Sequence, residues 1–357
     1  MKILYISTDN WIYNWVIEYK EQMKKIFEDK IQFSFLKWID VHPFDDEISI
    51  SINTRTNLDF LFSYNLIVFS NTTNKNAVIK MKYLFDTLIK EKSIWKQIPQ
   101  IAIWIHRGEN TQEDKWIQLF KEEIESLNII LITNSDINKR YYERIFNKSI
   151  VNLDLIYEPQ KTFLSEDKNQ IKDNSCICCS RITHQKKIED VVKLETPLKK
   201  TCIAVYEYKP SCFKGIWNKQ YCDKIFELNK KVNSPCIFTN DDKDKITYLK
   251  KASFLLDWTE FPKQMDKDRM QYTLLEGIDY FCIPVLKKSY FWGYIKENIN
   301  WISFETFQEY NNALIKKSDS SLFDELFLSI IHNNSILLEN YTKTTYDKFI
   351  SFYSKFL

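Results

Sequence analysis

The chain has 357 residues, which is long enough for two domains with separate cores. Its 50 Lys and Arg residues nearly balance its 48 Asp and Glu residues, so overall charge gives no support to a nucleic-acid or anionic-membrane partner. Neither a membrane-spanning apolar stretch nor a signal peptide is recognisable, so we expect a cytoplasmic protein without membrane insertion.

In the first half, strand-like runs alternate with amphipathic helical segments. The expected strands are 2–7, 65–70, 100–106, 128–135 and 152–157, and the clearest helices are 12–27 and 77–92. Continuous apolar strands separated by helices predict a parallel sheet that is covered on both faces. His106 ends the third strand and opens a polar loop, so it would point towards a ligand at the carboxyl edge of the sheet. The alternative is an ordinary surface histidine.

A polar stretch without periodicity, residues 158–174, is the best candidate for a linker. The alternation then restarts, with expected strands at 176–180, 202–208, 235–241, 252–258 and 282–286. We therefore predict an α/β protein of two doubly wound, Rossmann-like domains that face each other across a central cleft. The expected domains are 1–160 and 161–338, followed by a C-terminal helix, 339–357, that returns to the first domain.

Two cations follow the first strand of the second half. Arg181 and Lys186 lie five residues apart across the expected turn from strand to helix, where they would surround the positive end of that helix. A diphosphate needs such charges together with fixed hydrogen-bond donors. His184 lies in the same loop and could contact phosphate. The alternative is a pair of solvated charges at the start of a helix.

The stretch 269–286 reads as a helix followed by a strand, and it carries Glu276. Its neighbours Leu274, Leu275 and Ile278 make the helix otherwise apolar, where an unpaired carboxylate is costly. Asp268 precedes Glu276 by eight residues, so the two carboxylates could lie along one side of a helix and contact one ligand.

Three cysteines, Cys176, Cys178 and Cys179, stand close together on an expected strand. No second group of Cys or His at ligand spacing accompanies them, so buried thiols are the better interpretation. We predict no metal and no cofactor apart from the substrates.

These patterns resemble the retaining glycosyltransferases of the GT-B fold, which carry an acid-x7-Glu pattern and an Arg and a Lys in the diphosphate loop. Within that group the chain is similar to the DNA α-glucosyltransferases of T-even phages. The similarity runs through IWIHRGEN, NIILITNSD, SRITHQK and YTLLEGIDYFCIPVL, and covers about half of the chain. The chain departs from the family at Ser180 in the diphosphate loop, at Arg107, and in the loop after the first strand. Arg107 affects the acceptor side, and the loop after the first strand implies that acceptor or phosphate contacts near residues 8–11 differ.

The resemblance implies that His106 contacts the donor sugar, that Arg181 and Lys186 hold the diphosphate, and that Glu276 binds the ribose. Catalytic roles then fall to the first three of these residues. The implied donor-binding residues are Glu276, Asp268, Thr273, His184 and Asp257.

The implied activity is transfer of a hexose, most naturally glucose, from a UDP-sugar to an acceptor hydroxyl. The acceptor is either a hydroxymethylated pyrimidine in phage DNA or a bacterial surface saccharide. A catalytically inactive nucleotide-sugar-binding protein is the non-enzyme alternative. DNA would require a local basic patch. Residues 198–220 are the candidate, because Lys199, Lys200, Lys209, Lys214 and Lys219 alternate there with aromatic residues; a solvated face is the other interpretation.

Overall fold

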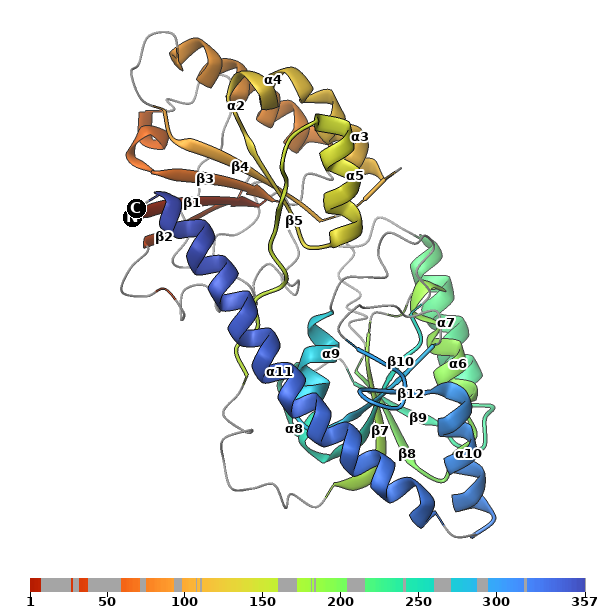
Figure 1. Ribbon diagram of the computed structural model, residues 1–357. Helices are drawn as coiled ribbons and strands as arrows, with labels where there is room; N and C mark the ends of the chain where they lie inside the picture. Colours follow the sequence, from red (N-terminus) through yellow and green to blue (C-terminus); the bar gives the residue numbers. More distant parts are fainter. Residues whose placement is uncertain are drawn as a thin grey trace. The chain divides into compact units, whose positions relative to one another are not determined.

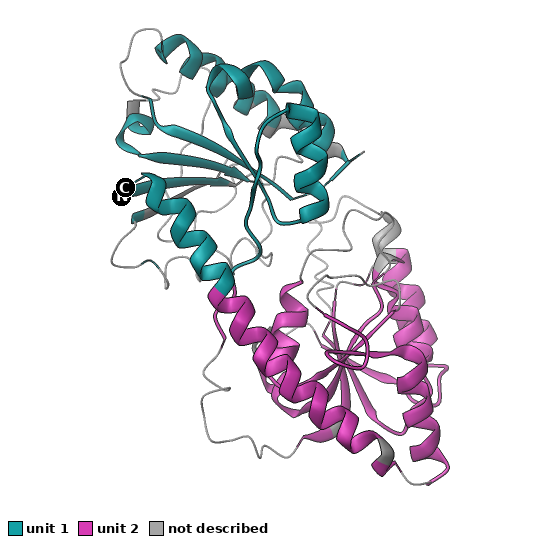
Figure 2. Ribbon diagram, in the orientation of Figure 1, with its two compact units in different colours: residues 1–156, 344–357 teal, residues 157–343 magenta. Residues whose placement is uncertain are grey.

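The computed structural model describes residues 1–7, 27, 32–37, 59–70, 75–92, 98–106, 108–109, 111–159, 172–180, 182, 184–203, 216–239, 242–259, 271–287, 295–317 and 320–356. The chain divides into two compact units (Figure 2). Unit 1 comprises residues 1–156 and 344–357, and unit 2 comprises residues 157–343. Each contains a parallel sheet with helices packed against it, so the predicted α/β class is confirmed.

The sheet of unit 1 has the strand order β2-β1-β3-β4-β5-β6 in the described residues. Its strands are β1 (Lys2–Ser7), β2 (Gln32–Lys37), β3 (Leu66–Ser70), β4 (Gln100–Ile105), β5 (Ile130–Thr133) and β6 (Val151–Asn152). The helices are α2 (Lys75–Lys92), α3 (Gln112–Leu119), α4 (Lys121–Ser126) and α5 (Asp136–Phe146), together with the last part of α11 (Asp324–Tyr353) (Figure 1).

Helices bury both faces of this sheet, which explains why its central strands are apolar throughout. On one face, Phe69 of β3 contacts Phe85 of α2, which in turn contacts Phe120. On the other face, Phe349, Phe352 and Tyr353 of α11 join the core formed by β1, β3, β4 and β5. The C-terminal helix therefore packs on unit 1, as predicted, although α11 begins at Asp324, earlier than the expected start at residue 339.

The sheet of unit 2 has the strand order β12-β11-β10-β7-β8-β9 in the described residues. Its strands are β7 (Asp173–Cys179), β8 (Lys199–Ile203), β9 (Cys236–Thr239), β10 (Ala252–Asp257), β11 (Ile283–Leu286) and β12 (Ile302–Ser303). Its helices are α6 (Ile188–Lys193), α7 (Ile216–Asn229), α8 (Asp242–Lys251), α9 (Tyr272–Asp279), α10 (Phe304–Ile315) and the first part of α11.

The strand order of unit 2 reverses between β7 and β10. From β7 the chain builds β8 and β9 to one side, then returns to build β10, β11 and β12 on the other. In doubly wound sheets, ligands bind outside the carboxyl ends of the strands at such a reversal. A ligand site is therefore expected at the loops that follow β7 and β10.

Several elements differ from those expected. The strands β2 and β12 were not predicted, and the expected strand 152–157 pairs only at its start, since β6 is Val151–Asn152. The expected helix of 269–286 begins only at Tyr272, because the backbone of Gln271 is extended, with φ −102° and ψ 139°. The helix that carries Glu276 therefore does not include Gln271, and Asp268 lies outside the described residues.

Most of the helix expected at 12–27 and most of the linker expected at 158–174 also lie outside the described residues. No described helix is long and apolar enough to cross a membrane.

Candidate functional site

A chain of hydrogen bonds joins the two loops at the reversal of strand order in unit 2. Lys186, which follows β7, donates from Nζ to Thr259 Oγ1 at 2.9 Å. The Thr259 hydroxyl in turn donates to Oδ1 of Asp257, the last residue of β10, and the same oxygen accepts the Thr259 backbone N–H at 3.0 Å. Asp257 and Thr259 are both buried, at 7% and 1% exposed. The predicted residues Lys186 and Asp257 are thus brought together.

Lys186 also reaches the beginning of α9. Its Nζ donates to Oε1 of Gln271 at 3.0 Å. Gln271 is the N-cap residue of α9, but its side chain makes no capping bond to the helix. The first turn of α9 contains no acidic residue. A lysine ammonium therefore lies next to the positive end of a helix, and this arrangement favours an anion at that place.

Thr273 and Glu276 lie on α9 itself. Thr273 is half-buried in the first turn, and Glu276 comes one turn later. The Nζ of Lys245, from α8, lies 2.6 Å from each of the two carboxylate oxygens of Glu276. The Glu276 side chain is 16% exposed, so the carboxylate is paired and still partly open to solvent.

Close packing fixes the backbone of α9 around Glu276. A Cβ on Gly277 would lie 2.4 Å from Cδ2 of Leu255 in β10, so a larger residue here would force the Leu255 side chain to move. At the end of the helix, the Tyr157 hydroxyl donates to Oδ2 of the buried Asp279 at 2.7 Å. Burial, and then the Asp279 charge, raise the pKa of Tyr157 far above its usual range.

In unit 1, His106 lies directly after β4 and is only 4% exposed, so it is not a surface histidine. Its Nε2 is 2.7 Å from Oγ of Ser70, the last residue of β3, and its ring stacks on Trp104. Its backbone N–H donates to Oε2 of the buried Glu113 at 2.9 Å. These side chains form a buried polar cluster at the carboxyl edge of the sheet.

The cluster continues into α3 and α5. The Tyr141 hydroxyl donates to Oδ2 of Asp114 at 3.1 Å. Burial, together with the charge of Asp114, raises the pKa of Tyr141 to about 12. The tyrosine therefore stays protonated at neutral pH and acts as a hydrogen-bond donor.

The other predicted residues are placed as follows. His184 is exposed, and its ring lies against Tyr221 with the centroids 3.8 Å apart. Arg181 and Asp268 lie outside the described residues. Sequence reasoning missed Thr259, Gln271 and Lys245. The position of Thr259, two residues after a strand that ends in Asp257, is a signal that the sequence contains. Lys245 belongs to no recognisable motif.

The candidate basic segment 198–220 has fewer accessible cations than expected, because one of its lysines is buried. Lys200 is 2% exposed, and its Nζ donates to the backbone oxygens of Val191, Val192 and Leu194 at the end of α6. Burial lowers the pKa of Lys200. Lys200 therefore stabilises a helix end and cannot contact phosphate, which corrects the sequence-based prediction. Lys199 is exposed at the start of β8, while the side chains of Lys209, Lys214 and Lys219 lie outside the described residues.

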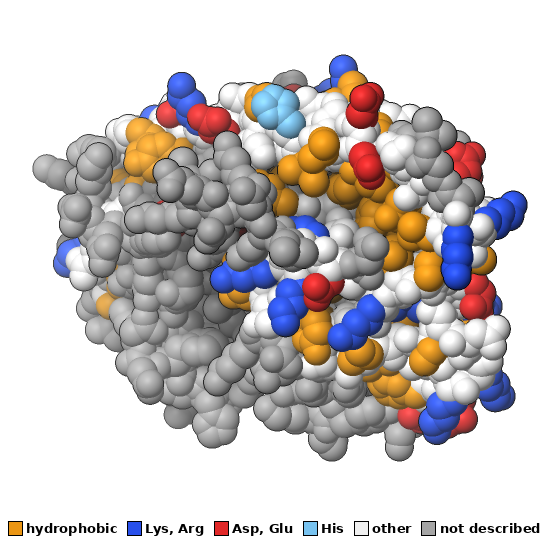
Figure 3. Space-filling model, turned by 90° about the horizontal axis from the view of Figure 1, so that it is seen from below, with side chains coloured by type: hydrophobic (Ala, Val, Ile, Leu, Met, Phe, Trp, Pro, Cys, Tyr) orange, Lys and Arg blue, Asp and Glu red, His pale blue; other side chains and the backbone are white. Residues whose placement is uncertain are grey.

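The described surface carries charged side chains of both signs (Figure 3). On the face shown in Figure 3, the described Lys and Arg side chains are interspersed with Asp, Glu and hydrophobic side chains. Among the described residues, no group of three or more His, Cys, Asp or Glu side chains could hold a metal ion.

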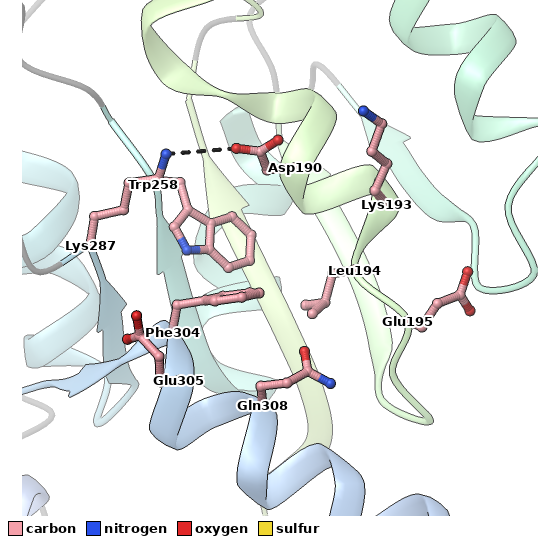
Figure 4. Close-up of a pocket in the computed structure, with 9 residues that line it drawn as sticks. All are labelled: Asp190, Lys193, Leu194, Glu195, Trp258, Lys287, Phe304, Glu305 and Gln308. Carbon is pink, nitrogen blue, oxygen red and sulfur yellow. Dashed lines mark ion pairs between the residues drawn. The ribbon is translucent and has the colours of Figure 1, made fainter.

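A cavity of about 700 Å³ opens between α6 and α10 (Figure 4). Trp258 and Phe304 meet edge to face in it, and Lys287 pairs with Asp190 at 3.7 Å. The rest of the described lining is Lys193, Leu194, Glu195, Glu305 and Gln308. None of the predicted site residues that the structure describes is among them, but Trp258 lies between Asp257 and Thr259, so this cavity borders the Lys186 network.

The chain is similar to known proteins in structure, at low sequence identity. No protein-family model matches the chain, and no curated protein matches it in sequence. An α-glucosyltransferase in complex with UDP-glucose and DNA containing an abasic site is similar in structure, with a TM-score of 0.64 and 15% identity over 94% of this chain and 95% of that one. The DNA-modifying enzyme β-glucosyltransferase gives a TM-score of 0.56 and 12% identity, over 100% and 99% of the two chains.

A sucrose-phosphate synthase from Thermosynechococcus elongatus is also similar, with a TM-score of 0.64 and 11% identity over 99% of this chain and 98% of that one. These likenesses extend over nearly the whole chain, although sequence identity is low. The chain therefore has the GT-B fold of these glycosyltransferases, as its sequence motifs predicted.

Proposed function

We propose that the protein is a retaining glycosyltransferase that moves a hexose, glucose in the first instance, from a UDP-sugar to an acceptor hydroxyl. The observation that carries this proposal is the position of the Lys186 ammonium beside the N-terminus of α9, with Glu276 one turn further along the same helix. Glu276 comes four residues after Tyr272, which is about 6 Å along the helix axis. That separation suits a nucleotide whose diphosphate lies at the helix end and whose ribose lies beside Glu276.

The proposed residue roles follow from the charge that develops in the reaction. The bond between the sugar C1 and the diphosphate oxygen breaks, and negative charge grows on the leaving group. Lys186, Arg181 and the N-terminus of α9 stabilise that charge. The acceptor oxygen bonds to C1 from the same face, and its proton passes to the departing diphosphate, so no side-chain base is assigned.

The remaining residues hold the donor. Glu276 accepts hydrogen bonds from the ribose hydroxyls, and Thr273 donates to a phosphate. The assignment of His106 to the donor sugar rests on its sequence motif alone. Asp257 acts through Thr259, which it orients towards Lys186. His184 and Asp268 are assigned to the donor on the strength of their place in the sequence motifs.

The test is release of UDP from a panel of UDP-sugars, first without any acceptor. We expect slow hydrolysis, fastest with UDP-glucose, and loss of that hydrolysis in the Lys186→Ala variant. Thermal unfolding with the same panel gives a second readout, because a ligand at about 100 times its dissociation constant adds about 2.7 kcal/mol of stability. Binding without turnover over all donors and acceptors would instead identify a nucleotide-sugar-binding protein.

For the acceptor, we propose a hydroxymethylated pyrimidine in DNA. Several structurally similar α-glucosyltransferases are in complex with DNA, among them one with a 13-mer that contains an HMU base. A saccharide acceptor is the second candidate. It is favoured by the equal structural likeness to a sucrose-phosphate synthase and by the burial of Lys200, which removes one cation from the expected DNA-binding segment.

A further inference from the structure

Lys245 is a residue to which neither the sequence motifs nor the proposed mechanism gives a role. It lies in the first part of α8, while its partner Glu276 lies on α9, 31 residues later. Its Nζ is 2.6 Å from both carboxylate oxygens. The two side chains are only 23% and 16% exposed, so the pair is shielded from solvent more than an ordinary surface ion pair.

The pair lies at the carboxyl edge of the sheet, next to the loop that follows β7. Its electrostatic effect reaches Cys179, the last residue of that strand. Burial raises the pKa of the Cys179 thiol well above its usual range, and of the two nearby charges Lys245 lowers this pKa while Glu276 raises it. Lys245 lies near the start of α8, which follows β9, and Glu276 lies on α9 shortly after Gln271, the partner of Lys186, so both charges lie near the Lys186 network.

The backbone of α9 leaves Glu276 little freedom, but its side chain still has rotatable bonds. Contact of Gly277 with Leu255 and the bond from Tyr157 to Asp279 set the position of the helix. What remains to be fixed is the direction of the carboxylate. A carboxylate has about four acceptor positions, and one ammonium that spans both oxygens leaves some of them for other donors.

We propose that Lys245 is a positioning residue for ribose recognition, which holds the Glu276 carboxylate in place and directs its remaining acceptor positions towards the 2′- and 3′-hydroxyls. This inference rests on the proposed function, because it takes a nucleotide ribose as the ligand of Glu276. It assigns a function to an ion pair that would otherwise be regarded as a link between α8 and α9.

The test compares UDP with 2′-deoxy-UDP by isothermal titration calorimetry. The variants are Lys245→Met, which removes the charge, Lys245→Arg, which keeps it, and Lys250→Met, an exposed lysine on the same helix that serves as the matched control. We expect the wild type to bind UDP at least about tenfold more tightly than 2′-deoxy-UDP, a ratio that one charge-assisted hydrogen bond supplies. Lys245→Met should reduce this preference to about threefold or less, whereas Lys245→Arg and Lys250→Met should keep most of it.

A purely structural role would weaken both nucleotides equally and leave their ratio unchanged, and that result would overturn the inference. A wild-type protein that binds UDP without preference for the ribose would overturn it together with the ribose role of Glu276, whereas a wild type that binds no uridine nucleotide would refute the proposed function itself. If Lys245→Met does not fold, as judged by circular dichroism, Lys245→Gln keeps a hydrogen-bond donor without the charge and is judged by the same ratio.

Discussion

At the scale of single residues, Glu276 is the side chain whose role is easiest to isolate. Glu276→Gln keeps the shape of the side chain but removes the charge that accepts hydrogen bonds from ribose hydroxyls. Such charge-assisted bonds contribute about 1.5–3 kcal/mol each, so UDP binding should weaken by about tenfold or more. Calorimetry with UDP measures this loss, and inorganic pyrophosphate, which has no ribose, is the control ligand. Equal weakening of both ligands would show that Glu276 acts on the diphosphate or on folding.

Lys186 should show a different kinetic pattern, because the charge that it stabilises grows during the reaction. Removal of a single stabilising donor of this kind costs about 10²-fold in kcat or more. We therefore expect Lys186→Ala to lower kcat for UDP-sugar hydrolysis far more than it raises KM. Steady-state kinetics with UDP-glucose measures both constants. Lys193→Ala, which removes an exposed lysine in the same unit, should leave them unchanged.

A Lys186→Ala variant with normal kcat and a raised KM would contradict the mechanism. It would indicate that the bonds of Lys186 to Thr259 and Gln271 serve only to hold the two loops together.

At the scale of elements, the end of α6 is stabilised by Lys200, which the sequence analysis placed in a candidate DNA-binding segment. Lys200→Met removes the donor to three backbone oxygens and leaves them buried, at a cost of about 1–3 kcal/mol in the free energy of unfolding. Lys199→Met, next to it but exposed, should change stability by less than about 0.5 kcal/mol. Urea unfolding of the two variants compares them. Equal stability of both would mean that water can replace the Lys200 bonds.

Lys200 also shows why some predictions from sequence fail. Period and composition identified most strands of both sheets, since short apolar runs such as that of β4, placed between amphipathic segments, are typical of buried parallel strands. The same reasoning missed β2 and β12, of which β12 has only two residues. Charge counting treated Lys199 and Lys200 alike, because the fold alone decides which of two adjacent lysines in a strand is buried.

The candidate site was predictable to the extent that it follows from motifs at the ends of strands. Lys186 and Asp257 were expected at one edge, and they meet there through Thr259. Lys245 could not be foreseen, since its partner is 31 residues away and the contact arises only when the fold brings Lys245 of α8 to Glu276 of α9. The spacing of Asp268 and Glu276 suggested one helix, but no propensity rule predicts that the extended backbone at Gln271 delays its start.

At the scale of the whole molecule, the net charge of the chain is close to zero, so the salt dependence of glucose transfer distinguishes a DNA acceptor from a saccharide. The chain has only two more basic than acidic residues, so any affinity for DNA must come from a few local cations that neutralise phosphates. Each neutralised phosphate contributes about −0.9 to the slope of log affinity against log salt. Transfer of glucose to DNA should therefore fall steeply as salt is added, while transfer to a saccharide should change little.

The deciding experiment mixes the protein with UDP-glucose and hydroxymethylcytosine-containing DNA over a range of salt concentrations, then digests the DNA to nucleosides for mass analysis. We expect a hexose adduct whose yield falls with salt along a slope set by the number of phosphates contacted. DNA with unmodified cytosine is the control, because it has the same phosphates but lacks the acceptor hydroxyl. Since Lys200 is buried, Lys200→Met should leave the slope unchanged, whereas loss of an exposed lysine that contacts DNA should reduce it by about one. Donor hydrolysis without a hexose adduct at any salt concentration would indicate that the acceptor is a saccharide and not DNA.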